Sequence, residues 1–71
     1  MAGPIPSAKE LRAFKIGARA RKFATEECVI EGYELLYTAI AEAKSADPAL
    51  HTLLLHELER YELHVSKLEE A

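Results

Sequence analysis

The sequence predicts a single all-α domain over residues 1–71, built as a small bundle or hairpin of two to three helices. Apolar residues recur every three or four positions along most of the chain, which is the spacing of one face of an α-helix. Strand-like alternation of β-branched residues is absent from the sequence. The helix-breaking residues are only Gly3, Pro4, Pro6, Gly17, Gly32 and Pro48.

Composition supports a folded but marginally stable domain. Hydrophobic residues make up 49% and charged residues 30% of the chain, enough for a core and a solvated surface. A core in a chain below about 80 residues seldom supplies more than roughly 3 to 5 kcal/mol, so a further source of stability is expected. Cys28 is the single cysteine and cannot form a disulfide within the chain. Homo-oligomerisation is therefore the expected source.

The first predicted helix covers residues 8–24 and follows an irregular lead over residues 1–6. Ser7-Ala8-Lys9-Glu10 has the pattern of a capping box, in which the serine hydroxyl accepts a hydrogen bond from the amide of Glu10.

The boundary of the second helix is less clearly marked. Thr25 followed by Glu26 and Glu27 favours a new helix over residues 26–45, whereas Gly32 favours a kink instead. Two arrangements stay open at this stage. One is a three-helix bundle with a break near residue 24 or 32, and the other is a hairpin in which the first two helices are continuous.

The last helix is predicted over residues 48–69. Asp47 can accept from the free amides of its first turn, and Pro48 suits the first helical position because its φ is already set. Two matching apolar stripes then predict that this helix packs on the preceding one. The stripes are Val29, Tyr33, Leu36, Ile40 and Ala43, and Leu54, Leu58, Tyr61, Val65 and Leu68.

The first helix has two apolar flanks. One consists of Leu11, Phe14 and Ala18. The other, more than about 90° away at 100° per residue, consists of Ile16, Ala20 and Phe23. A helix with two apolar flanks requires two neighbours, so we predict that Leu11, Phe14 and Ala18 form an interface. The expected partner is a second copy, with a dimer favoured, or the helix of another protein.

Charge is distributed unevenly. Residues 1–22 carry six basic residues against Glu10 alone, a net +5, and residues 23–71 carry three against eleven acids, a net −8. Four cations of the first helix fall within about 80° of each other and form what we call the basic stripe: Arg12, Lys15, Arg19 and Lys22. Such a stripe can contact nucleic-acid phosphates or an anionic membrane, or it can pair with acidic helices of the same or a neighbouring chain.

Patterns typical of catalysis or metal binding are not found. His51, His56 and His64 are five and eight residues apart, which places them on different faces of one helix. Glutamates at 57, 59, 62, 69 and 70 alternate with apolar positions and are predicted to form a solvated face. Cys28 has acidic rather than basic neighbours, which does not favour a catalytic thiol. We therefore expect no catalytic residues, no metal and no cofactor.

These observations predict a small protein–protein interaction or regulatory module without enzymatic activity. The alternative is a small nucleic-acid-binding regulator that uses the basic first helix. The sequence lacks an apolar run of the about 18 residues needed to cross a bilayer, and its start does not resemble a secretory signal. A cytoplasmic location with no transmembrane segment is therefore expected.

Overall fold

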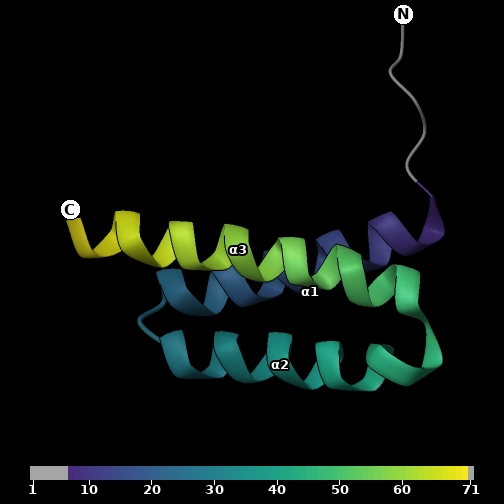
Figure 1. The fold of residues 1–71 in the computed structure, drawn as a ribbon. Helices are drawn as coiled ribbons and strands as arrows, with labels where there is room; N and C mark the ends of the chain where they lie inside the picture. The colour runs from purple at the N-terminus through teal and green to yellow at the C-terminus, as the bar shows by residue number, and fades with distance from the viewer. Residues whose placement is uncertain (1–6, 71) are drawn as a thin grey trace, which may run out of the picture.

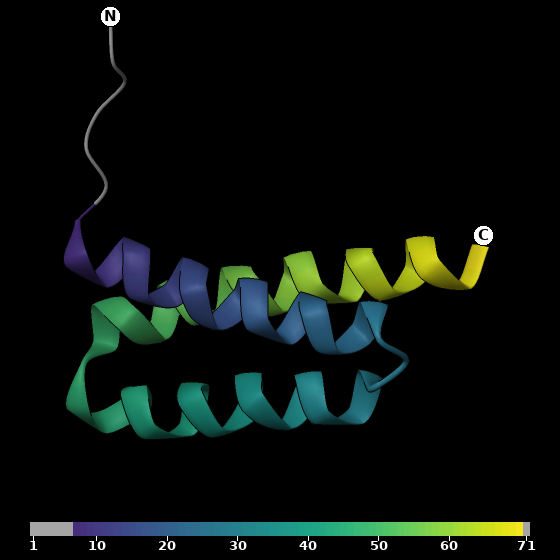
Figure 2. The same cartoon turned by 180° about the vertical axis from the view of Figure 1, so that it is seen from behind.

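The computed structural model describes residues 7–70 and shows three α-helices packed against one another. They are α1 (Ala8–Thr25), α2 (Val29–Ala46) and α3 (Pro48–Glu70). Helix α2 runs antiparallel to α1 and α3, and every pair of helices is in contact (Figure 1, and from behind in Figure 2). No strand occurs within residues 7–70. The predicted small all-α bundle is confirmed, whereas the predicted lead over residues 1–6 lies outside the described residues.

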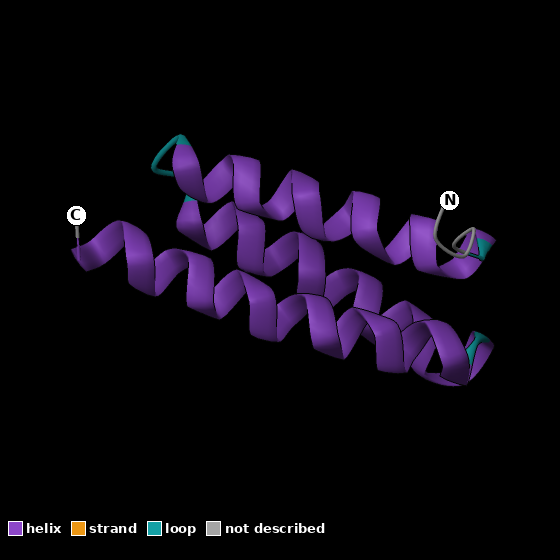
Figure 3. Ribbon diagram, turned by 90° about the horizontal axis from the view of Figure 1, so that it is seen from above, coloured by secondary structure: helices purple, strands orange, loops and turns teal. Residues whose placement is uncertain are grey.

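The bundle has two layers. Helices α1 and α3 lie side by side, and α2 lies beneath the space between them, as the view from above shows (Figure 3). This arrangement leaves α1 and α3 with one covered face, which rests on α2, and one uncovered face.

Both predicted capping residues act as caps. The Ser7 hydroxyl oxygen accepts from the amide of Glu10 at 3.2 Å, and the Asp47 carboxylate accepts from the amide of Leu50 at 3.3 Å. Pro48 is the first residue of α3. The start signals of the first and last helices are thus confirmed.

A turn at residues 26–28 separates α1 from α2, so the two helices are not continuous. The amide of Cys28 donates to the carbonyl of Phe23 at 2.8 Å, and the amide of Glu27 donates to the carbonyl of Ala24 at 3.0 Å. Glu27 adopts a positive φ of 67°, which completes a Schellman motif. Thr25 does not cap α2 as its sequence context favoured; it ends α1, and its hydroxyl donates to the carbonyl of Arg21.

Small residues of α1 allow the core to form. The inward face of α1 carries Ala13, Gly17, Ala20 and Ala24. Against this face pack the largest fully buried side chains, which are Leu36, Leu54 and Tyr61. Short side chains on α1 let the other two helices approach closely, and the predicted stripes of α2 and α3 supply most of the volume.

Tyr61 is the centre of the core at the end near the α1–α2 turn. Its hydroxyl donates to the carbonyl of Val29 at 2.5 Å, and its ring meets that of Tyr33 edge-on, with 4.8 Å between centroids. A Cβ at Gly32 would lie 2.6 Å from Cζ of Tyr61. Gly32 therefore lies within α2, where the Tyr61 ring packs against it, and does not mark a kink. Leu68, expected in the same stripe, is 39% exposed because α3 extends past the end of α1 (Figure 1).

Candidate docking surface

The two flanks of α1 have different environments. Ala20 is fully buried and Ile16 and Phe23 are partly buried, so the bundle covers this flank. On the other flank, Leu11 is 44% and Phe14 50% exposed. Ala18 is partly exposed beside them. Helix α1 thus contacts both α2 and α3, yet neither helix covers this flank, and the three predicted interface residues lie at the surface.

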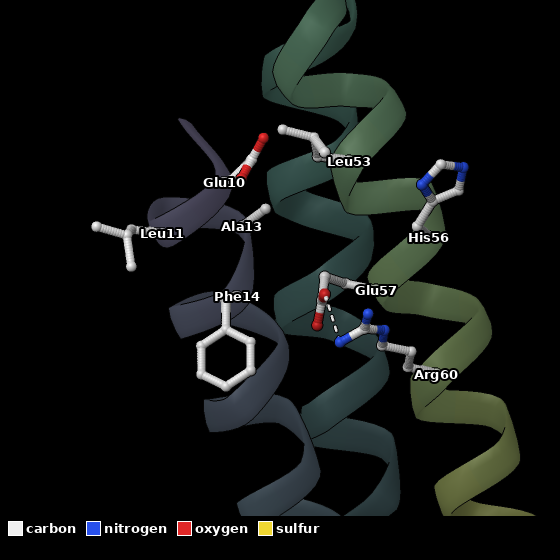
Figure 4. Close-up of a pocket in the computed structure, with 8 residues that line it drawn as sticks. All are labelled: Glu10, Leu11, Ala13, Phe14, Leu53, His56, Glu57 and Arg60. Atoms are coloured by element: carbon white, nitrogen blue, oxygen red, sulfur yellow. Dashed lines mark ion pairs between the residues drawn. The ribbon is translucent and has the colours of Figure 1, made fainter. Parts of the chain in front are cut away.

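An open groove of about 500 Å³ runs between α1 and α3 beside this flank. Helix α1 contributes Glu10, Leu11, Ala13 and Phe14, and α3 contributes Leu53, His56, Glu57 and Arg60. In Figure 4, Leu53 and Glu57 point from α3 toward α1, and α2 lies behind both helices. The groove thus opens on the face of the bundle that is turned away from α2. Ala18 does not line the groove and lies farther along the same flank of α1.

Glu57 corrects the prediction of a fully solvated glutamate face. It is only 7% exposed and lies against Gly17 of α1. Its carboxylate accepts from Nη1 of Arg21 at 3.0 Å, and Nη1 of Arg60 lies 3.7 Å from its second oxygen, the pair dashed in Figure 4. Glu57 can be buried with its charge because two guanidinium groups face it and because Gly17 leaves space for it. The other four glutamates of that group are exposed, as predicted.

Phe14 is held at the groove by the same ionic cluster. The guanidinium carbon of Arg21 lies 5.7 Å from the centroid of the Phe14 ring, within the range of a cation–π contact. Arg21 therefore contacts Glu57 and Phe14 together, which links the polar floor of the groove to its apolar rim. A side chain supported in this way loses less conformational freedom when a partner covers it.

The basic stripe lies next to this apolar flank on the outer side of α1. Arg12, Lys15, Arg19 and Lys22 are all exposed. Over residues 7–70, the ion pairs within 4.0 Å involve Lys9, Arg21 and Arg60 and none of these four cations. Within residues 7–70, the structure thus shows no ion pair between the stripe and the acidic helices of the same chain at this distance, and pairing with a neighbouring chain stays a prediction.

The outer face of α2 is a second exposed surface, and the sequence analysis did not single it out. Ile30 is 69% and Tyr37 53% exposed, and the Tyr37 ring stacks on Tyr33 with 5.8 Å between centroids. Three exposed acids lie on this helix: Glu31, Glu34 and Glu42. Ile30 falls outside the apolar stripe that predicted the core, and this is the signal that could have identified the surface.

Titratable and nucleophilic side chains elsewhere are dispersed. His64 Nε2 lies 3.0 Å from the Thr25 hydroxyl, whereas His56 lies at the groove and His51 is near the start of α3. Cys28 precedes α2, with its sulfur 3.7 Å from the carbonyl of Glu26. Across residues 7–70, no three histidine, cysteine, aspartate or glutamate side chains are grouped so that they could hold a metal ion.

Two further findings bear on function. None of the helices described between residues 7 and 70 combines the length and the apolar character needed to span a membrane. No protein-family model, no curated protein and no solved structure matches the chain. The groove, the basic stripe and the outer face of α2 are thus the features from which a function can be inferred.

Proposed function

We propose that this protein is a non-catalytic interaction or regulatory module that binds a helix along the α1–α3 groove, and that the helix comes from a second copy of the chain. The observation that carries the proposal is the half exposure of Leu11 and Phe14 beside an open groove. Covering a large apolar side chain fully contributes roughly 1.5 to 3 kcal/mol, so covering the exposed half of each should contribute about 1 kcal/mol. Small chains commonly gain stability by such association.

The groove has the anatomy of a docking surface. Leu11, Phe14 and Leu53 give it apolar side chains beside the ionic cluster of Glu57, and the exposed basic stripe lies next to Leu11 and Phe14 on the outer side of α1. The proposed location is the cytoplasm, which suits a chain whose single cysteine has no partner for an internal disulfide.

Sedimentation equilibrium tests this proposal. The chain mass is 7.9 kDa, and we expect the wild type to sediment as a dimer or larger species. Phe14→Glu places a charge in the apolar contact and should shift the protein toward the monomer. Ser66→Glu is the matched control, because Ser66 is exposed on α3 outside the groove lining. A wild type that stays monomeric at millimolar concentration would refute the proposal.

Binding of nucleic acid is the second candidate, and the unpaired basic stripe specifically favours it. Four phosphate contacts would make the logarithm of the binding constant fall with the logarithm of salt concentration with a slope of about −3 to −4. Lys15→Ala with Arg19→Ala should reduce that slope by about two, and Lys67→Ala, outside the stripe, should change it less. A chain that fails to bind duplex DNA or RNA at low salt would exclude this function.

A further inference from the structure

From the placement of charged and apolar surfaces, we infer that the occupant of the groove is the outer face of α2 from a second copy, so that copies associate head to tail. The inference rests on the proposed function and specifies the partner surface. Each molecule would then bind through two surfaces. We call the α1–α3 groove the acceptor surface and the outer face of α2 the donor surface.

Charge disfavours the simplest symmetric alternative. If two copies met through α1 on a two-fold axis, the basic stripe of one copy would lie beside the basic stripe of the other. The whole basic stripe lacks an ion-pair partner within residues 7–70, so no acid of the same chain would offset that repulsion. The surface that covers Leu11 and Phe14 should therefore be acidic as well as apolar.

The outer face of α2 meets both requirements. Ile30 and Tyr37 supply exposed apolar side chains, and Glu34 lies within about 60° of both around the helix. Glu31 and Glu42 lie farther around α2, with Glu42 on the side toward α1, and the exposed Lys44 continues the line of Ile30 and Tyr37. Three acids against one base leave this helix face with a net negative charge. Ile30 and Tyr37 are seven residues apart, as are Leu11 and Ala18 on α1. Both separations correspond to about 10 Å along a helix and to nearly the same direction around it, which suits side chains that interdigitate between neighbouring helices.

The positions of the two surfaces determine the kind of assembly. The groove opens away from α2, and the outer face of α2 lies on the opposite layer of the bundle (Figures 1 and 4). A contact between two different surfaces on opposite sides of a molecule is heterologous and leaves one groove and one α2 free after two copies have joined. In each assembled copy, the α1–α3 layer would then be covered on both faces. Helix α2 of the same copy covers one face, and α2 of the neighbouring copy covers the other. The dimer is thus the first step of a longer series.

Charge reversal on each surface provides the test. The acceptor variant carries Lys15→Glu and Lys22→Glu, and the donor variant carries Glu31→Lys and Glu34→Lys; all four positions are exposed. Each variant alone has like charges on both surfaces and should associate at least about tenfold more weakly than the wild type. An equimolar mixture has complementary surfaces and should recover association. The control carries Glu59→Lys and Glu70→Lys. It changes the net charge by the same amount as the donor variant, but at exposed positions of α3.

Sedimentation of these proteins, with circular dichroism to verify helix content, separates the outcomes. The inference predicts a wild-type mass that rises past the dimer with concentration and falls at high salt. A donor variant that associates like the wild type, or a mixture that fails to recover association, would overturn the inference. If Phe14→Glu still disrupts association in that case, the groove remains the interface and the proposed function stands. A monomeric wild type would refute both, and a mass that saturates at the dimer would overturn the head-to-tail arrangement alone.

Discussion

At the scale of single residues, Gly17 and Glu57 depend on each other. Glu57 is buried at the α1–α3 contact, and Arg21 and Arg60 face its charge. A Cβ built on Gly17 would overlap the carboxylate and lie 2.8 Å from its carbon. The absence of a side chain at position 17 is therefore what allows the ionic cluster to form.

Gly17→Ala is expected to destabilise the fold by about 1 to 2 kcal/mol. Loss of the charge-assisted hydrogen bond between Arg21 and the displaced carboxylate costs roughly 2 to 3 kcal/mol, and the better helix propensity of alanine offsets about 1 kcal/mol of that loss. Urea unfolding measures the difference. The control is the same change in a Glu57→Ala background, where alanine at 17 should be neutral or stabilising. Equal destabilisation in both backgrounds would show that Glu57 does not restrict position 17.

Among residues 7–70, Glu27 is the one residue with a left-handed backbone conformation. Its φ of 67° puts an L side chain in the left-handed region, where steric crowding costs roughly 1 to 2 kcal/mol. Glu27→Gly removes that crowding at a small entropic cost and should stabilise the protein by about 0.5 to 1 kcal/mol. Glu26→Gly, at a φ of −91°, should have no such benefit. Thermal melts of the two variants test this, and a destabilised Glu27→Gly would contradict it.

At the scale of elements, Asp47 connects two helix starts. It caps α3 and pairs with Lys9 at the start of α1, with 3.1 Å between Nζ and Oδ1. Two hydrogen bonds lower the pKa of Asp47 below its usual value. The larger effect comes from Lys9 and the smaller from the backbone amide of Leu50. Because the folded pKa lies below the unfolded one, the charged form stabilises the fold above about pH 4, the ordinary aspartate range. This contribution is lost as the pH falls through the lower folded pKa.

Asp47→Asn isolates the charge from the cap, because asparagine caps helices about as well as aspartate. The variant should be less stable than the wild type at pH 7, and the difference should disappear as the pH falls through the lowered folded pKa of Asp47. Chemical unfolding at a series of pH values measures it. Lys9→Gln should reduce the same pH dependence. A difference between Asp47→Asn and wild type that is constant with pH would show that the charge contributes nothing.

At the scale of the whole molecule, stability and association should be linked. A partner that binds only the folded state shifts unfolding to higher denaturant as its concentration rises. The urea midpoint of the wild type should therefore increase with protein concentration, and that of Phe14→Glu should not. Fluorescence of the tyrosines at several concentrations provides the measurement. A wild-type midpoint independent of concentration would indicate that the exposed flank of α1 has no folded-state partner in the sample.

Local interactions made several features of this protein predictable from its sequence. Caps at Ser7 and Asp47 act within one helical turn, and the apolar stripes of α2 and α3 follow from the helical period alone. The α1–α2 boundary was placed too early, because its left-handed residue is glutamate where glycine would be the usual signal. Such positions depend on the folded turn rather than on residue type.

Residue order along the chain was enough to predict that the protein is helical, where its first and last helices start, and that α1 has more apolar surface than one neighbour covers. Packing between the helices sets the rest: Ile16 and Ala20 turn inward, Leu11 and Phe14 remain outside, and Glu57 is buried. Helix periodicity is a property of neighbouring residues along the chain. Which face is covered depends on how closely helices distant in sequence approach, and that depends on small residues such as Gly17 at the points of contact.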